Sequence, residues 1–270
     1  MGSEGRRVSP EILAALANIE EEHSVRILLA VESGSRAWGF ASVDSDYDVR
    51  FIYTHALDWY LRVSEQRDVI EVAGPNLLDA SGWELRKTLR LFAKCNLGLN
   101  EWLNSPVVYR EAVGFRSQLQ ALIPSFFNPI AAVHHYLSMA RVTYDSCDAA
   151  GIIRTKKLFY VLRALLACRW IDRNSSQPPT EFARLVDEVA TESERFWIAG
   201  LWAQKSRGHE GDETALNQER RSAITRELAF MSDYGSRAPR PTKATDAVLD
   251  AVLSEWVLRE TVTASAAPTS

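Results

Sequence analysis

Paired acidic side chains are the residues of this chain whose types and spacing indicate chemistry. Asp46 and Asp48 lie two residues apart at the start of an apolar run. If residues 46–53 form a strand, both carboxylates lie on the same face. Two carboxylates held that close repel each other unless a cation lies between them, and Mg²⁺ prefers such oxygen ligands. Asp-Ser-Asp is also common in polar turns, so a purely structural role is the alternative.

A Gly-Ser turn precedes the acidic pair. The apolar run at 27–31 leads directly to Gly34 and Ser35. Where a strand turns into a short helix, backbone N–H groups and a serine hydroxyl suit a phosphate, although Ser35 could also serve only as a helix N-cap. Arg36 follows and suits either a phosphate contact or an exposed helix position. A phosphate site beside a two-carboxylate metal site is typical of phosphoryl or nucleotidyl transfer.

A third carboxylate would complete such a site by binding the metal that activates the attacking hydroxyl. Asp79 is our choice because it lies in a strand-like apolar segment, residues 77–81. Glu71, one predicted strand earlier, is the alternative. For either residue, the competing interpretation is a surface charge at the end of a strand.

The elements that position these residues predict an α+β fold. Ser9 and Pro10 are typical of a helix start, and we expect a short helix at 35–39 after the first strand. Apolar runs and alternation predict further strands, and a 3.6-residue period predicts further helices. The expected strands are 27–31, 46–53, 68–72 and 77–81. The expected helices are 10–22, 83–94, 111–122, 129–147, 152–172, 180–206, 214–232 and 243–260.

Helical periodicity dominates after Pro106, so we expect two domains. Residues 1–106 form a domain with a mixed sheet, residues 107–260 form an all-helical domain, and residues 261–270 form a disordered tail. In this arrangement all three acidic candidates lie in the first domain.

Composition narrows the function further. The chain has 270 residues, 46% of them apolar, and a net charge of −4, which is ordinary for a globular protein and argues against a broadly basic nucleic-acid binder. A local excess of Lys and Arg between Arg141 and Arg173 suits a triphosphate. We expect no membrane span, no signal peptide, and reduced thiols at three widely spaced cysteines, hence a cytoplasmic protein.

Several sequence blocks, in order, resemble a known family. The Gly-Ser, spacer and Asp-x-Asp pattern is similar to the nucleotidyltransferase superfamily that includes DNA polymerase β. Further blocks resemble its bacterial and phage-borne subgroup of predicted RNA-repair nucleotidyltransferases, over roughly residues 25–175. These blocks are DASGWELRKTLRL from Asp79, KCN from Lys94, NEWLNSP from Asn100, KKLFYVLR from Lys156 and CRWI from Cys168. Leu97 departs from the family pattern, in which proline is usual.

The resemblance implies a site as well as a fold. It implies two Mg²⁺ ions, with Mn²⁺ as the alternative, bound by Asp46, Asp48 and Asp79. It also favours Lys87, Lys157 and Arg163 as cations that bind the nucleotide, with the helical part covering the cleft.

The implied reaction is attack by an acceptor hydroxyl on the α-phosphorus of a nucleoside triphosphate, with release of pyrophosphate. The resemblance favours an RNA 3′ end as the acceptor. Nucleotidylation of a protein or a small molecule is the first alternative, and a nucleotide-binding module without turnover is the second. A pure binder has no use for the third carboxylate, which favours an enzyme.

Overall fold

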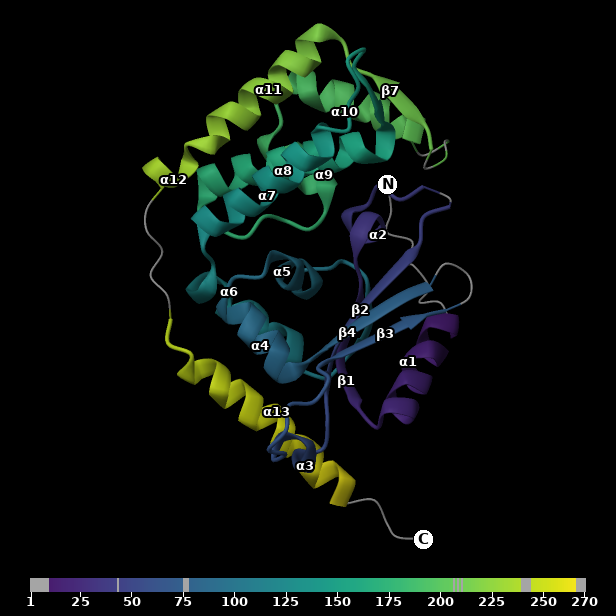
Figure 1. Cartoon of the computed structure of the whole chain (residues 1–270), viewed down its shortest axis with the longest axis vertical. Helices are drawn as coiled ribbons and strands as arrows, with labels where there is room; N and C mark the ends of the chain where they lie inside the picture. Colours follow the sequence, from purple (N-terminus) through teal and green to yellow (C-terminus); the bar gives the residue numbers. More distant parts are fainter. Residues whose placement is uncertain are drawn as a thin grey trace. The chain divides into compact units, whose positions relative to one another are not determined.

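The computed structural model describes residues 10–42, 44–74, 78–205, 207, 209, 211–238 and 244–265, with side chains up to residue 259. These residues form two compact units (Figure 1). The sheet unit is the described part of Met1–Ser33, Asp46–Leu122 and Ala244–Ser270. The helical unit is the described part of Gly34–Ser45 and Ile123–Lys243. The predicted α+β class is confirmed.

The sheet unit is built on a five-stranded mixed sheet in the order β3-β4-β2-β1-β5. Strands β2 and β4 run parallel, and the other neighbours run antiparallel. The strands are β1 (Arg26–Glu32), β2 (Tyr47–Thr54), β3 (Val69–Ala73), β4 (Leu78–Glu84) and β5 (Val108–Glu111). The helices are α1 (Pro10–His23), α3 (Leu57–Tyr60), α4 (Leu85–Ala93), α5 (Leu97–Leu103), the part of α6 (Phe115–Phe126) up to Leu122, and α13 (Ala247–Ser265).

The two faces of the sheet are covered by different helices (Figure 1). The apolar stripe of α1, which includes Leu16, packs into one core cluster with Val49 and Phe51 of β2. On the other face, Trp83 of β4 contacts Trp102 of α5, with ring centroids 4.0 Å apart. Because side chains alternate along a strand, the even-numbered residues of β2 lie on this second face.

Gly82 lets β4 lie close to β2. It lies opposite Phe51 in the parallel ladder. A Cβ atom at position 82 would collide with the Phe51 ring. The glycine in this sequence block is therefore explained by packing within the core.

The helical unit contains the remaining described helices and one small sheet. Its helices are α2 (Gly34–Trp38), α7 (Pro129–Tyr144), α8 (Thr155–Asn174), α9 (Phe182–Val189), α10 (Glu192–Lys205), α11 (Gln218–Ser232) and α12 (Tyr234–Arg237). Two short strands, β6 (Ile152–Arg154) and β7 (Glu213–Ala215), pair antiparallel. The prediction of an all-helical domain therefore missed this small sheet. The pairing joins segments about sixty residues apart, so the local sequence gives little sign of it.

Residues 34–45 pack with the helical unit although they connect β1 to β2. The ring of Trp38 meets Tyr160 of α8 edge-on, with centroids 4.9 Å apart. The ring centroid of Phe40 lies 5.1 Å from that of Phe159 and 5.5 Å from that of Phe182. This aromatic cluster assigns the segment that follows Ser33 to the helical unit.

The compact units differ from the predicted domains, whose boundary lies at Pro106. Strand β5, beyond that boundary, pairs with β1. Helix α13 also belongs to the sheet unit, where Trp256 Nε1 donates to Gln118 Oε1 at 2.7 Å and the Trp256 ring contacts Phe115. Helix α13 continues to Ser265, into the predicted disordered tail, and residues 266–270 lie outside the described part.

Two observations concern the predictions of reduced cysteines and of no membrane span. All three cysteines are free, and burial raises the pKa of the Cys168 thiol, which keeps it protonated and unreactive. Across the described residues, no helix combines the length and apolar character needed to cross a membrane.

Candidate active site

The parallel pairing of β2 and β4 places Asp48 next to Asp79. The two residues are direct neighbours in the ladder, where adjacent strands lie about 4.8 Å apart. Their side chains are 31% and 59% exposed. Two carboxylates from different parts of the sequence therefore lie together at one end of the sheet.

Arg50 lies between the two carboxylates. Its Nη2 atom donates to Asp48 Oδ1 at 3.0 Å and to Asp79 Oδ2 at 2.8 Å. Its Nη1 atom donates to the backbone carbonyls of Asp79 at 2.9 Å and Val49 at 3.1 Å. The guanidinium of Arg50 thus balances the repulsion between the Asp48 and Asp79 carboxylates.

Asp46 immediately precedes strand β2. Strand β2 begins at Tyr47, so Asp46 precedes the strand in which it was expected, and it is exposed. Among the described residues, no three His, Cys, Asp or Glu side chains gather as a set of metal ligands. The strand pairing itself places two of the predicted carboxylates, Asp48 and Asp79, side by side.

The donor atoms nevertheless fit a divalent cation. Carboxylate oxygens are the ligands that Mg²⁺ and Mn²⁺ favour. One oxygen of each carboxylate already lies within 3.0 Å of a single cationic group, Arg50 Nη2. That guanidinium marks a position where positive charge is stable. Asp48 and Asp79 would bind the ion, with Asp46 as the nearest further carboxylate in the chain.

Glu32 supports the start of β2 next to the candidate site. It is 1% exposed, and its Oε1 accepts a hydrogen bond from the backbone N–H of Asp48 at 2.9 Å. Its other oxygen accepts from the Tyr109 hydroxyl, and its carbonyl accepts from Ser105 Oγ at 2.6 Å. This buried carboxylate fixes the backbone that carries Asp48.

Sequence reasoning did not single out Glu32 or Arg50, although each leaves a signal. Glu32 ends an apolar run that is buried along its length, where an acidic residue needs partners. Arg50 lies two residues after Asp48, on the same face of the predicted strand.

The Gly-Ser turn has the form predicted from sequence. Gly34 has φ +59°, and α2 begins there. Ser35 is buried, and its carbonyl accepts from the N–H groups of Gly39 and Phe40 at 3.1 and 3.0 Å. Arg36 Nη2 donates to the Ser45 carbonyl at 2.6 Å, so this guanidinium is engaged within its own loop.

The chain matches a described protein family over nearly its whole length. Residues 8–255 match the RNA repair pathway DNA polymerase beta family, RlaP. The chain belongs to this family. RlaP proteins are polymerase-β-like nucleotidyltransferases, so this member is a nucleotidyltransferase enzyme.

Two individual proteins are similar to this RlaP family member. A Bacillus subtilis (strain 168) protein with the name "Uncharacterized protein YcgL" is 48% identical over 202 residues, which is 74% of this chain and 78% of the relative. The crystal structure of a nucleotidyltransferase-like protein from Exiguobacterium sibiricum 255-15 matches 83% of this chain and 75% of its own. Its sequence identity is 11% and its TM-score is 0.30.

Lys87 lies away from the carboxylates of this RlaP protein. Its Nζ pairs with Asp68 Oδ1 at 2.9 Å, in the first turn of α4. Helix α4 begins after Glu84, five residues beyond Asp79, and five strand residues span roughly 16 Å. Lys87 is thus at the opposite end of β4 from the predicted metal ligands.

Arg163 and Lys157 belong to α8 of the helical unit. Arg163 is 1% exposed, and its guanidinium lies over the Trp38 ring, 4.3 Å from the centroid. Its Nη2 reaches the Thr180 carbonyl at 3.5 Å. Arg163 therefore stabilises the core that anchors the 34–45 segment. Lys157 precedes Tyr160 by three residues, so it shares the α8 face that meets Trp38.

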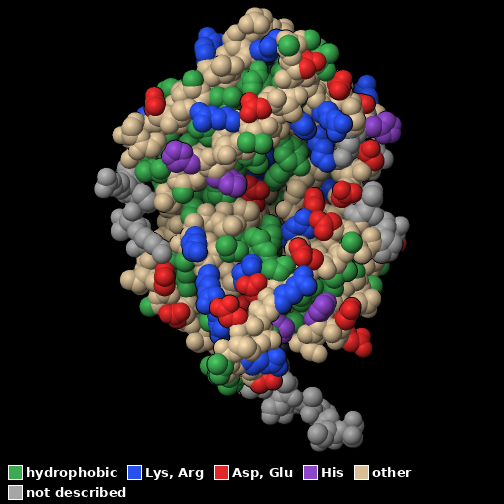
Figure 2. All heavy atoms as spheres, in the orientation of Figure 1, with side chains coloured by type: hydrophobic (Ala, Val, Ile, Leu, Met, Phe, Trp, Pro, Cys, Tyr) green, Lys and Arg blue, Asp and Glu red, His purple; other side chains and the backbone are tan. Residues whose placement is uncertain are grey.

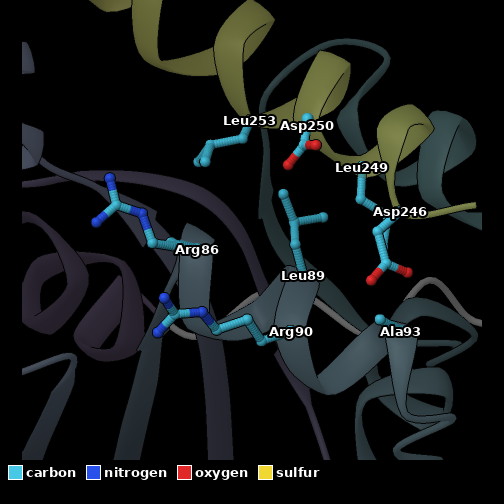
Figure 3. Close-up of a pocket in the computed structure, with 8 residues that line it drawn as sticks. All are labelled: Arg86, Leu89, Arg90, Ala93, Asp246, Leu249, Asp250 and Leu253. Carbon is cyan, nitrogen blue, oxygen red and sulfur yellow. The ribbon is translucent and has the colours of Figure 1, made fainter.

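A separate cavity lies between α4 and α13 of the sheet unit (Figure 3). Its volume is about 320 Å³. Arg86 and Arg90 project from α4, Asp250 projects from α13, Asp246 lies just before α13, and leucines from both helices also line the cavity. Because α4 follows the far end of β4, this cavity is distinct from the paired carboxylates.

Surface charge is mixed. Figure 2 shows Lys, Arg, Asp and Glu side chains interspersed over the visible face. This pattern agrees with the net charge of −4.

Proposed function

We propose that this RlaP family member transfers a nucleoside monophosphate from a nucleoside triphosphate to an acceptor hydroxyl, an RNA 3′ end, with divalent metal ions. The observation that supports the proposal most strongly is the pairing of Asp48 with Asp79 around one cationic group. Family membership supports the reaction class. The two neighbouring carboxylates, Asp48 and Asp79, support this position for the active site.

In this proposal Asp48 and Asp79 hold the metal, with Asp46 as a further ligand. When bound, the metal neutralises charge on the phosphates and lowers the pKa of the attacking hydroxyl. Asp79 is 59% exposed, which leaves space beside it for an acceptor. Gly34 and Ser35 remain the proposed phosphate contacts on sequence grounds.

The proposed transfer step needs few further residues of the chain. The hydroxyl oxygen bonds to the α-phosphorus as the bond to pyrophosphate breaks, and the hydroxyl proton is lost to solvent or to a carboxylate. The buried Glu32 serves by holding the backbone of Asp48 in place. Positioning of this kind accounts for much of the rate gain in nucleotidyl transfer.

The acceptor is tested by following the label. The protein is incubated with each α-labelled nucleoside triphosphate, Mg²⁺ or Mn²⁺, and short RNA ending in either a 3′ hydroxyl or a 3′ phosphate. We expect label on the 3′-hydroxyl RNA alone. Label on the protein itself would instead support protein nucleotidylation, and bound nucleotide without transfer would contradict an enzymatic role.

Two variants make this assay specific to the proposed site. Asp48→Asn removes a proposed ligand and should abolish transfer. Glu71→Gln, on the same sheet but in an exposed pair with Arg67, is the matched control and should keep it. Full activity of Asp48→Asn would overturn the site assignment.

A further inference from the structure

Arg50 makes two kinds of hydrogen bond with its two terminal nitrogens. Nη1 donates to two backbone carbonyls, those of Val49 and Asp79. Nη2 donates to two carboxylates, those of Asp48 and Asp79. The first pair anchors the side chain to the sheet, and the second pair lies at the position proposed for the metal.

A divalent ion that bridges the two aspartates through the oxygens that Nη2 contacts would take the place of Nη2. Mg²⁺ binds carboxylate oxygens at about 2.0–2.1 Å and tolerates little deviation from octahedral geometry. Asp48 Oδ1 and Asp79 Oδ2 both already lie within 3.0 Å of Nη2. Two positive centres cannot occupy one such position, because both sterics and charge repulsion oppose it.

The burial of the three side chains is compatible with an exchange. Arg50 is 19% exposed, Asp48 31% and Asp79 59%, so solvent and ions reach the carboxylates. Charge-assisted hydrogen bonds at partly exposed positions are broken at moderate cost. The two bonds of Nη1 involve carbonyl oxygens and need not change when Nη2 moves.

We propose that Arg50 is a positioning residue that competes with the metal for Asp48 and Asp79. The guanidinium holds the two carboxylates together, and a divalent ion binds by displacing Nη2 while Nη1 remains anchored. This inference rests on the proposed function, because it takes the metal to bind between these two aspartates.

The test is direct measurement of Mn²⁺ binding, by electron paramagnetic resonance of the free ion in titrations of the full-length protein. Arg50→Met removes the competing charge, and Arg67→Met, which removes an exposed arginine from the same unit, is the control. We expect the Kd for Mn²⁺ to fall by about tenfold in Arg50→Met, from the strength of charge-assisted hydrogen bonds, and to stay unchanged in Arg67→Met.

A second variant protects the test against misfolding. Arg50→Lys keeps the charge but loses the planar fork that reaches both carboxylates, so its Kd should lie between those of wild type and Arg50→Met. Equal or weaker binding in both Arg50 variants, with binding lost in Asp48→Asn, would overturn the role of Arg50 and leave the metal site intact. Absence of Mn²⁺ binding in wild type and in every Arg50 variant would overturn both proposals.

Discussion

The two ends of the β2–β4 pair carry carboxylates in opposite circumstances. At one end, Asp79 lies beside Asp48, is exposed, and accepts a hydrogen bond from the side chain of Arg50. At the other, Glu84 lies beside Tyr53 and is 1% exposed. Glu84 accepts from the Tyr60 hydroxyl at 2.6 Å and from the N–H groups of Arg86 and Lys87 at 2.8 and 3.1 Å.

The difference separates a structural carboxylate from an available one. Glu84 caps α4, where backbone N–H groups and the helix dipole favour a negative charge, and its partners are fixed. Asp79 instead accepts a hydrogen bond from the Arg50 side chain, which the proposed metal would displace. Under this proposal, the same two strands hold a fixed carboxylate at one end and would bind exchangeable cations at the other.

The largest effect of a mutation is expected at the exposed end of the β2–β4 pair. Asp79→Asn should reduce nucleotidyl transfer by at least about 100-fold, because an amide binds a divalent ion far more weakly than a carboxylate. The rate of label transfer, measured with saturating triphosphate and acceptor, checks this. Activity within tenfold of wild type would mean that Asp79 is not a metal ligand.

The buried end should respond in stability instead. Glu84→Gln leaves part of the cap in place but replaces a charged acceptor, and we expect a loss of about 1–3 kcal/mol in the free energy of unfolding. Urea titration measures it, and transfer per folded molecule should be unchanged. Asp79→Asn is the matched control, with a stability change below about 1 kcal/mol.

A pH dependence should also appear at the buried end. His55, just after β2, stacks on Trp59 at 4.3 Å, and burial lowers its pKa from 6.5 to about 4. Between these values the unfolded chain binds the proton more readily than the folded protein, so His55 contributes stability above pH 6.5 that is lost as the pH falls toward 4. Thermal unfolding of His55→Gln should show a shallower decline over this window, and an identical decline would contradict it.

The smallest effect is expected at Glu71, the alternative third carboxylate. It pairs with Arg67, and the two side chains are 67% and 74% exposed. Glu71→Gln should change the free energy of unfolding by less than about 0.5 kcal/mol. Transfer should stay within twofold of wild type, and a loss comparable to that of Asp79→Asn would reverse the choice between them.

The features that depend on short segments of the sequence were predicted correctly. The family, the α+β class and the mixed sheet are confirmed, because apolar runs, caps and motif blocks lie within short segments. The roles of Asp46, Asp48 and Asp79 stay predictions, although the sheet register does bring Asp48 beside Asp79.

What the sequence did not reveal depends on contacts between distant segments. Arg50 bridges two carboxylates only because β2 and β4 run parallel in this register. The placement of Lys87 depends on which end of β4 leads into α4. The assignment of residues 34–45 to the helical unit depends on Trp38 and Phe40 meeting α8, which neither segment alone indicates.

Gly82 has no functional group, but it affects the candidate site through the register of β4 against β2. A strand that slips by two residues keeps the same faces, so hydrophobic patterning alone does not forbid the error. Such a slip of β4 would press the side chain of Ala80 or Glu84 against the Phe51 ring, where the ladder has space only for hydrogen. The smallest residue in the sheet therefore fixes the alignment that sets two acids from separate strands side by side.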